Sequence, residues 1–444
     1  MSAPESASLL ENARFNALVI VPNALQGVFR RRRAAVAAAT RADVDGQAVG
    51  LFAGMRRGHN GGPVWVRVIR EPALLLLTPA DVHRALESSP DPFASDPEPK
   101  RKGMVAFQPD ALTISRSETW RNRRAFNEAV LDTPSPVHGL GDRFVAVAAE
   151  ETAALIAAAE ADGDRELRWE GWSDAFRRIT RRVILGDSAA DDAELSATLA
   201  EMMSEANGMP GRTSALYPGF IARLGDYVAA AEEGSLVSRF AEAPADAETK
   251  PVGQIPHWMF ATGETLAINS FRALALLASH APQRARAAAE IDAGDLSVAE
   301  GVAGLADLGA CLEEAMRLWP TTPTLSRVTL ADTEWGGATV PALTQVLIPN
   351  TFLHRDRDRH DYADRFAPQR WISGEAAGDW SFNHFSRGPQ GCPGAALALL
   401  LGKAVLATVL RSSAVELAAP SLDPARPLPH MLDFFGLRFE LARL

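Results

Sequence analysis

Cysteine is nearly absent from this chain of 444 residues, since only Cys311 and Cys392 are present. Two cysteines cannot form a disulfide framework, so the sequence predicts a protein of a reducing compartment, which we expect to be the cytoplasm. No apolar run reaches the ~18–20 residues that a membrane span requires. The nearest run, 395–410, contains Lys403 and predicts a buried helix. We therefore expect no secretion signal and no membrane anchor.

Several common functional motifs are also missing. The nine histidines and two cysteines show no Cys-x-x-Cys or His-Glu-x-x-His spacing, which argues against the usual zinc sites. Nucleotide binding has no support, because the sequence lacks Gly-x-x-x-x-Gly-Lys-[Ser/Thr] and lacks Gly-x-Gly-x-x-Gly after a strand. The simplest hydrolases have none either, because Gly-x-Ser-x-Gly is absent. A net charge of -10 argues against a nucleic-acid partner.

Helical patterns dominate what is present. Residues 64–77 alternate like a strand hairpin, Thr78 caps a helical pattern, and 328–349 resemble short strands around a Gly-Gly turn. Residues 89–103 form a Pro- and Asp-rich segment that we expect to be a loop. We predict a mainly α fold with small β-sheets, in a single domain 1–444 whose residues 1–35 form an N-terminal extension or entry segment.

Cys392 stands in the segment FSRGPQGCPG (385–394), among glycines and prolines. Pro393 is a favoured first residue of a helix, and the amides and dipole of that helix should favour the thiolate of Cys392. The glycines allow close approach of the backbone and of a flat ligand. The segment therefore suits an axial ligand of iron, and the alternative is a buried structural cysteine in a turn.

The pattern Phe385-x-x-Gly388-x-x-x-Cys392-x-Gly394 resembles the haem-binding loop of the cytochrome P-450 family, the haem-thiolate monooxygenases. The resemblance implies haem b as the cofactor, Cys392 as the iron ligand, and Phe385, Gly388 and Gly394 as cofactor-binding residues. Gln390 stands where the commonest bacterial form has a histidine or arginine that bonds a haem propionate. Its amide can still donate a hydrogen bond there, but without charge.

Two further segments resemble the parts of this family that reach the haem propionates. Trp120 and Arg124 are four residues apart in TWRNRRAF and share a helix face, like the family's Trp-x-x-x-Arg helix. Arg327 in TLSRVTL resembles the other propionate arginine, on the strand after the Glu-x-x-Arg helix. Without the resemblance, Trp120 and Arg124 would be ordinary packing and a surface charge.

Glu314 and Arg317 in CLEEAMRLWP are three residues apart, which in most helices indicates a solvated surface pair. The spacing also resembles the family's Glu-x-x-Arg helix, which implies a structural role. In the family a later Phe-x-Pro-x-Arg segment adds a second arginine. Here that segment is FAPQR, and we expect Arg370 to share the buried carboxylate of Glu314 with Arg317.

Glu264 and Thr265 in FATGETLAINS resemble the acid and alcohol of the family's long central helix. The resemblance implies that haem lies between this helix and the cysteine-loop helix, and that the pair relays protons during oxygen activation. Gly263, costly in mid-helix, indicates a local bulge. Thr262 stands where the family usually has glycine, and Leu266 replaces a frequent second hydroxyl.

Helical spacing extends this argument to the substrate pocket. If Thr265 faces the haem, Ala261 and His257 share its face and Phe260 flanks them. Leu325, on the strand that follows the Glu-x-x-Arg helix, would line the pocket as well. His257 would then be the one titratable group that meets the substrate. The alternative for this histidine is a packing role.

The resemblance implies a monooxygenase that inserts one atom of O2 into an apolar organic molecule. No reductase domain is evident, so electrons would come from a separate ferredoxin or flavodoxin system with its reductase. Two alternatives stay open, a peroxide-driven peroxygenase and a non-catalytic haem protein such as a sensor or recruitment subunit. The sequence leaves open the substrate and the choice among hydroxylation, coupling and demethylation.

Overall fold

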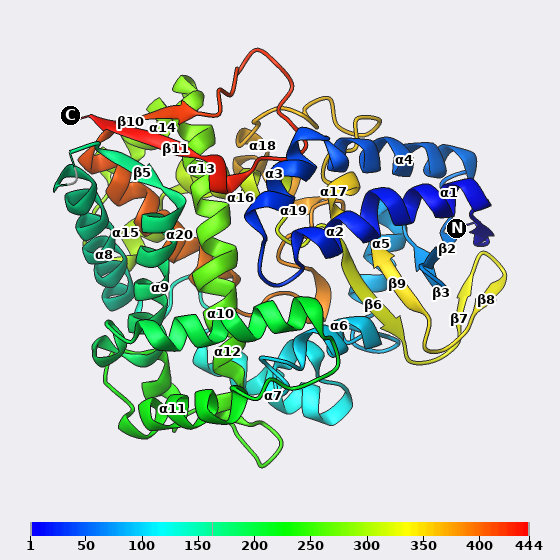
Figure 1. Ribbon diagram of the computed structural model, residues 1–444, viewed down its shortest axis with the longest axis horizontal. Helices are drawn as coiled ribbons and strands as arrows, with labels where there is room; N and C mark the ends of the chain where they lie inside the picture. Colours follow the sequence, from blue (N-terminus) through cyan, green and yellow to red (C-terminus); the bar gives the residue numbers. More distant parts are fainter. Residues whose placement is uncertain (1, 162, 443–444) are drawn as a thin grey trace.

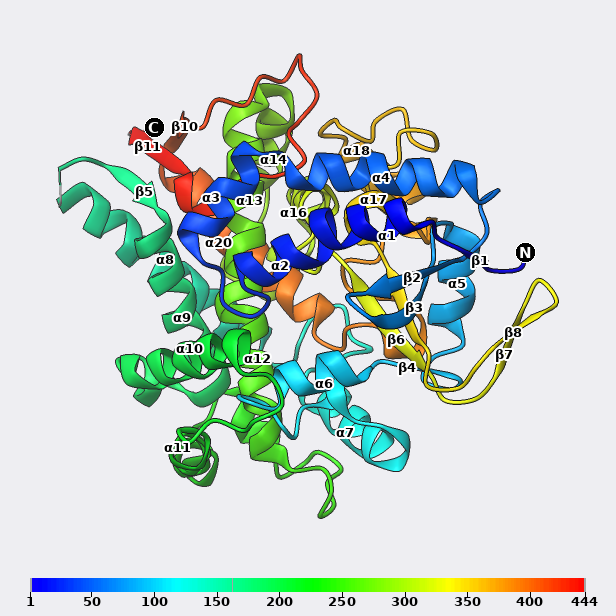
Figure 2. The ribbon, with the colours of Figure 1, turned by 45° about the vertical axis from the view of Figure 1, so that its right-hand side comes forward.

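The computed structural model describes residues 2–161 and 163–442. Figure 1 shows a helical part surrounding one long central helix, drawn in green, beside a part that contains the larger sheet. In Figure 2 the N-terminal helices α1 and α4 run along one side of that sheet. The predicted fold class, mainly α with small sheets, is confirmed.

The α-helices cover most of the chain. They are α1 (Leu9–Phe15), α2 (Val21–Gln26), α3 (Arg33–Arg41), α4 (Val44–Gly58), α5 (Pro79–Glu87), α6 (Glu98–Met104), α7 (Ser117–Val130), α8 (Gly141–Ala161), α9 (Trp169–Leu185), α10 (Ala193–Gly208), α11 (Tyr217–Ala230), α12 (Ile255–Phe260), α13 (Ala267–Ser279), α14 (Ala281–Ala293), α15 (Ala299–Ala303), α16 (Ala306–Leu318), α17 (Asn350–Leu353), α18 (Gln369–Ile372), α19 (Glu375–Gly378) and α20 (Ala395–Ser412).

Shorter helical segments connect these helices. Two are π-helices, η1 (Asn16–Ile20) and η6 (Ala261–Leu266). The others are single 3-10 turns, η2 (Leu112–Ile114), η3 (Asp187–Ala189), η4 (Leu236–Arg239), η5 (Pro251–Gln254), η7 (Gly388–Gln390) and η8 (Phe434–Gly436).

The strands form three sheets. The largest has the order β1-β2-β3-β9-β6-β4, a second has the order β10-β11-β5, and β7 pairs only with β8. The strands are β1 (Glu5–Ser6), β2 (Val64–Val68), β3 (Glu71–Leu75), β4 (Phe93–Ala94), β5 (Glu166–Arg168), β6 (Leu325–Thr329), β7 (Thr333–Trp335), β8 (Ala338–Val340), β9 (Gln345–Ile348), β10 (Ala414–Ala419) and β11 (Arg438–Ala442).

Local sequence patterns account for much of this architecture. β2 and β3 form the predicted hairpin, with Val66 opposite Ala73, and the Thr78 hydroxyl accepts the Asp81 N–H at the start of α5. The prediction that residues 89–103 form a loop is wrong, because this segment contains β4 and most of α6. Pro99 fits the first turn of α6, and β4 exists through pairing with β6, which lies over 200 residues away.

Helix α20 follows the cysteine segment as predicted. By length and composition it could cross a membrane, but 61% of it is buried inside the protein. It packs against α8 and α16, and Lys403 on it donates to the carbonyl of Ala303 at 2.6 Å. The helix therefore belongs to the core, as expected for an apolar helix that carries a buried lysine.

A buried ion pair joins α16 to the segment after β9. Glu314 and Arg317 have no exposed side-chain surface, and two hydrogen bonds of 2.6 and 2.7 Å connect them. Arg317 also donates to the backbone carbonyls of His354, Ala363 and Arg365. The structural role predicted for this pair agrees with this geometry, because the pair holds three parts of one loop in place.

Arg370 is not part of this network, contrary to the prediction. It is 36% exposed and pairs with Glu375 at 2.6 Å. The free side of the Glu314 carboxylate is instead occupied by the Trp371 indole N–H, at 2.8 Å, and by the Ala367 N–H, at 2.9 Å. Neutral donors satisfy the carboxylate without the desolvation cost of a second buried guanidinium.

These contacts predict unequal effects for two arginine substitutions. Arg317→Met should lower the free energy of unfolding by at least ~3 kcal/mol, because Glu314 then stays buried without its counter-charge. Arg370→Met is the matched control and should leave stability unchanged within error. Urea unfolding followed by circular dichroism measures both, and equal losses would show that Arg370 shares the buried network.

Candidate functional site

The cysteine segment folds into a tight loop between η7 and α20. The Cys392 N–H donates to the carbonyl of Phe385 at 2.8 Å, and the Gly391 N–H donates to that of Gly388 at 2.9 Å. Gly388 has φ +66°, and a Cβ there would lie 2.2 Å from the carbonyl oxygen of Leu86. Only glycine fits at this position, so the loop is fixed against α5.

The Cys392 side chain keeps accessible surface, yet burial is the largest influence on the pKa of its thiol. Burial raises this pKa, while the Gly394 N–H and the charge of Arg124 lower it less strongly. The expected bias toward thiolate from the helix terminus is therefore wrong for the chain alone, because desolvation is the larger effect.

Arg327 is a buried cation near this loop. It is 1% exposed and donates to the hydroxyls of Ser89 and Ser386, at 3.2 and 2.8 Å, and to the carbonyl of Ser326. Burial lowers its pKa to about 10. Across residues 2–161 and 163–442, no carboxylate lies within ion-pair distance of it. Such a guanidinium is costly, so the position suits an anionic group such as a haem propionate.

Lys100, on α6, is a second cation of this region and was missed from the sequence. Its ammonium donates to the carbonyls of Ser95 and Thr113 and to the Thr113 hydroxyl, at 2.9, 2.9 and 2.6 Å. Burial and the charge of Arg327 lower its pKa to about 7. Gln390 joins the same cluster, since its amide donates to the Ser95 hydroxyl at 3.2 Å. In the sequence, Lys100 is one of several charges in PEPKRKG and carries no distinguishing pattern.

Trp120 and Arg124 lie on α7, as their spacing predicted. Arg124 donates to the carbonyl of Gly391, next to Cys392, and to the carboxylate of Glu128. Trp120 is 9% exposed, and its indole N–H has no hydrogen-bond partner within the described part of the chain. Arg124 and Arg327 therefore approach the cysteine segment from two different elements.

The central helix contains the bulge that Gly263 indicated. Residues Ala261–Leu266 form the π-helix η6 between α12 and α13. Gly263 faces α9, where a Cβ would lie 3.5 Å from the Thr180 hydroxyl. Single π-turns inside α-helices are rare and frequently occur at functional sites.

The hydroxyl of Thr265 is free in this bulge. In helices of this protein, the hydroxyls of Thr152, Thr180 and Ser279 donate to the carbonyl four residues earlier, at 2.6–2.7 Å. Thr265 makes no such bond, nor any other hydrogen bond within the described residues, and its side chain is partly accessible. The hydroxyl is therefore available to a ligand or a water molecule.

Glu264 points toward α9 and pairs with Arg177 at 3.2 Å. Arg177 also bonds the exposed Asp174, so it connects Glu264 with the surface. A cavity of about 20 Å³ beside the pair is lined by Arg177, Thr180, Ser196 and Glu264, among others, and can hold one water molecule. The sequence analysis missed Arg177, because nothing distinguishes it from its neighbours Arg178, Arg181 and Arg182.

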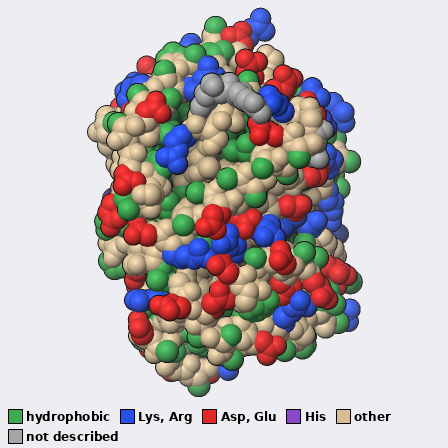
Figure 3. Space-filling model, turned by 90° about the vertical axis from the view of Figure 1, so that its left-hand side faces the viewer, with side chains coloured by type: hydrophobic (Ala, Val, Ile, Leu, Met, Phe, Trp, Pro, Cys, Tyr) green, Lys and Arg blue, Asp and Glu red, His purple; other side chains and the backbone are tan. Residues whose placement is uncertain are grey.

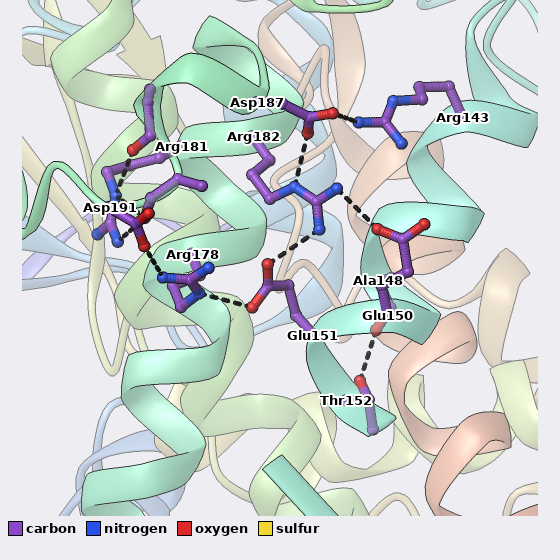
Figure 4. Close-up of polar contacts among 12 residues, drawn as sticks. Arg143, Ala148, Glu150, Glu151, Thr152, Arg178, Arg181, Arg182, Asp187 and Asp191 are labelled. Atoms are coloured by element: carbon purple, nitrogen blue, oxygen red, sulfur yellow. Dashed lines mark hydrogen bonds and ion pairs between the residues drawn. The ribbon is translucent and has the colours of Figure 1, made fainter. Parts of the chain in front are cut away.

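An ion-pair network holds α9 against α8 (Figure 4). Glu151 accepts from Arg178 at 2.7 Å and from Arg182 at 2.9 Å, and Arg182 also bonds Glu150 and Asp187. Acidic and basic side chains are likewise interspersed over the face drawn in Figure 3. The network fixes the helix from which Arg177 reaches Glu264.

The candidate substrate residues lie on the central helix and on β6. His257, Phe260 and Ala261 are partly accessible, whereas their neighbours Trp258 and Met259 are buried. Leu325, on the same strand as Arg327, is also partly accessible. The residues predicted from the spacing with Thr265 keep accessible surface, as do Thr262 and Glu264, so their contact with a substrate stays a prediction.

The other cysteine does not compete as a ligand. Cys311 is 1% exposed within the apolar core, and burial raises its pKa. Among residues 2–161 and 163–442 there is also no cluster of three His, Cys, Asp or Glu side chains placed to bind a metal. Cys392 is left as the candidate metal ligand.

An accessible thiol before a helix terminus and a buried Arg327 without a carboxylate partner suit a haem-thiolate type of site. Comparison with known families agrees, because the family model for cytochrome P-450 matches residues 249–430. This match assigns residues 249–430 to the cytochrome P-450 family, whose members carry haem b.

Individual relatives are more distant or matched only in part. Cyclooctat-9-en-7-ol 5-monooxygenase of Streptomyces melanosporofaciens is 26% identical over 68% of this chain and 71% of its own length. Cytochrome P-450 4c3 of Drosophila melanogaster is 31% identical over 37% of this chain. Cytochrome P-450 734A5 of Oryza sativa subsp. japonica is 32% identical over 44% of this chain. The chain spans only about a third of the length of the latter two relatives.

The unpaired state of Arg327 predicts its effect on the cofactor. Arg327→Gln should lower the amount of haem retained per protein after gel filtration by several-fold, because the buried charge that offsets a propionate is lost. Arg121→Gln, an exposed arginine on α7 paired with Glu118, is the control. Haem content is measured as the pyridine haemochromogen, and equal retention in both variants would contradict the role of Arg327.

Proposed function

We propose that this protein is a monooxygenase that inserts one atom of O2 into an apolar organic molecule and releases the other as water. One observation carries the proposal. The free hydroxyl of Thr265 lies in a π-bulge beside Glu264, in a chain that also presents an accessible cysteine thiol bordered by buried cations. Haem ligated by a cysteine thiolate supplies the activation of O2 when it is bound.

The proposed haem site uses residues from four elements. Cys392 would be the axial ligand, in the loop that Phe385, Gly388 and Gly394 shape. Propionates would be held by Trp120, Arg327 and Gln390, whose donors are unpaired or bonded to neutral groups, and by Arg124, which now bonds the Glu128 carboxylate. The positive charge of the iron would offset the desolvation that now raises the pKa of the thiol.

Protons would reach the site through the acid and the alcohol of η6. Glu264 faces the small cavity beside α9, from which it can be reprotonated by water. Arg177 orients the carboxylate through their ion pair of 3.2 Å. Thr265, with no hydrogen bond of its own, can hold a water molecule or donate its proton at the site of oxygen reduction. This division of roles favours a monooxygenase over a peroxygenase, because a peroxygenase needs no proton supply from solvent.

The substrate pocket would be lined by Phe260, Ala261, Leu325 and His257. Its largely apolar walls support an apolar organic substrate. The Streptomyces relative is named for 5-monooxygenation of cyclooctat-9-en-7-ol, which supports hydroxylation of such a molecule. Electrons would come from a ferredoxin or flavodoxin system with its reductase in the cytoplasm, since the 444 residues contain no glycine-rich nucleotide-binding motif.

The first test concerns the ligand. The reduced protein with carbon monoxide should show the long-wavelength Soret band of a thiolate-ligated haem. Cys392→Ser should lose this band, and Cys311→Ser, the buried control, should keep it. A protein without porphyrin, or a Cys392→Ser variant that keeps the band, would overturn the proposal.

The second test concerns the relay. With NADPH and a surrogate ferredoxin system, Thr265→Ala should lower the product formed per NADPH by several-fold while NADPH is still consumed. Thr152→Ala on α8, whose hydroxyl bonds only the Ala148 carbonyl, should leave this ratio unchanged. An unchanged ratio in Thr265→Ala would contradict the relay. Turnover with peroxide alone would favour the peroxygenase. The absence of product with either oxidant would favour a non-catalytic haem protein.

A further inference from the structure

His257 has a defined tautomer. Its Nδ1 lies 3.1 Å from the Oε1 of Gln108, and Gln108 is fully buried. In this orientation of the Gln108 carboxamide, whose nitrogen has no hydrogen-bond partner among the described residues, the oxygen accepts and Nδ1 carries the hydrogen. In a neutral imidazole the other nitrogen, Nε2, is then an acceptor with a free lone pair.

The ring is neutral and Nε2 is free. Burial and the positive charge of Lys100 lower the pKa of His257 to about 4. Within the described residues Nε2 has no hydrogen-bond partner, although the ring keeps accessible surface. The ring also lies beside Phe260, with the two ring centres 6.4 Å apart. An acceptor inside an otherwise apolar pocket is costly unless a ligand satisfies it.

The surroundings restrict what can satisfy this nitrogen. Phe260 and Phe107 lie edge to face with their ring centres 5.9 Å apart, so the neighbouring wall is apolar. Lys100 is close enough to repel a cationic amine, and its three hydrogens already bond Ser95 and Thr113, so it has none left for a carboxylate. The remaining donors are uncharged O–H and N–H groups, and the simplest of these on an apolar organic molecule is a hydroxyl.

We propose that His257 Nε2 accepts a hydrogen bond from a hydroxyl group of the substrate, which is therefore an apolar alcohol. The inference rests on the proposed function and specifies its substrate class. His257 and Thr265 are eight residues apart on the central helix, which corresponds to about 12 Å of rise. The hydroxyl would thus lie on the order of 10 Å from the carbon that is oxidised.

A series of 1-alkylimidazoles tests this in the haem-loaded protein. The imidazole end ligates iron and shifts the Soret band, while the alkyl chain reaches along the central helix. Chains of increasing length end in a methyl, a hydroxyl, a methyl ketone or a carboxylate group, and spectral titration gives the affinity of each. At one length the hydroxyl-to-methyl affinity ratio should be about 3- to 10-fold higher in the natural protein than in His257→Phe. The ketone should show no such gain.

A second variant examines the tautomer. In Gln108→Leu, Nδ1 loses its acceptor, so the preference for hydroxyl over ketone should diminish. A ketone gain equal to that of the hydroxyl, a tighter-binding carboxylate, or equal ratios in the natural protein and His257→Phe would each overturn the inference. The absence of a Soret shift with every imidazole would instead count against the haem site itself.

Discussion

Desolvation at Cys392 is the constraint on which the site depends. Burial disfavours the anion of this thiol, and one backbone N–H and the charge of Arg124 do not compensate. Arg327 has the opposite problem, a cation that burial destabilises and that no carboxylate among the described residues offsets. A group that brings a metal cation to the sulfur and carboxylates to the guanidinium relieves both costs. The chain is therefore complementary in charge to haem, and binding of haem should stabilise the fold as well as supply its chemistry.

The central helix combines two requirements that a regular α-helix does not meet together. In a regular turn, a threonine hydroxyl commonly bonds the carbonyl four residues earlier, as Thr152 and Thr180 do. The π-turn of η6 leaves the Thr265 hydroxyl without this bond, while Glu264 reaches Arg177 on the solvent side. The bulge thus separates a proton acceptor near the surface from a free hydroxyl inside, within two consecutive residues. The ion-pair network of α8 and α9 keeps the solvent side of this arrangement in register (Figure 4).

The sequence predicted most where local pattern and motif spacing decide the structure. The β2–β3 hairpin, the Thr78 cap, the Gly263 bulge and helix α20 follow from residues that are close in the chain. It failed where a distant partner decides, because β4 exists only through pairing with β6. Arg370 shows the same limit inside a motif. Trp371 is its neighbour in α18, and only the position of Glu314 determines which of the two side chains turns inward. Lys100 and Arg177 each stand among like charges, and the fold alone singles them out.

Charged side chains are unevenly distributed around the candidate site. Arg327 and Lys100, which have no carboxylate within ion-pair distance among the described residues, lie near β6 and the cysteine loop. Glu264 points toward α9, and His257 is neutral. Burial, and to a lesser extent the charge of Lys100, keep His257 uncharged, while the hydrogens of Lys100 are occupied by Ser95 and Thr113. A positively charged substrate would therefore pay a desolvation cost that no side chain near His257 compensates. An uncharged molecule with a single hydroxyl avoids this cost, and the one free acceptor of His257 would fix how far it extends toward Thr265.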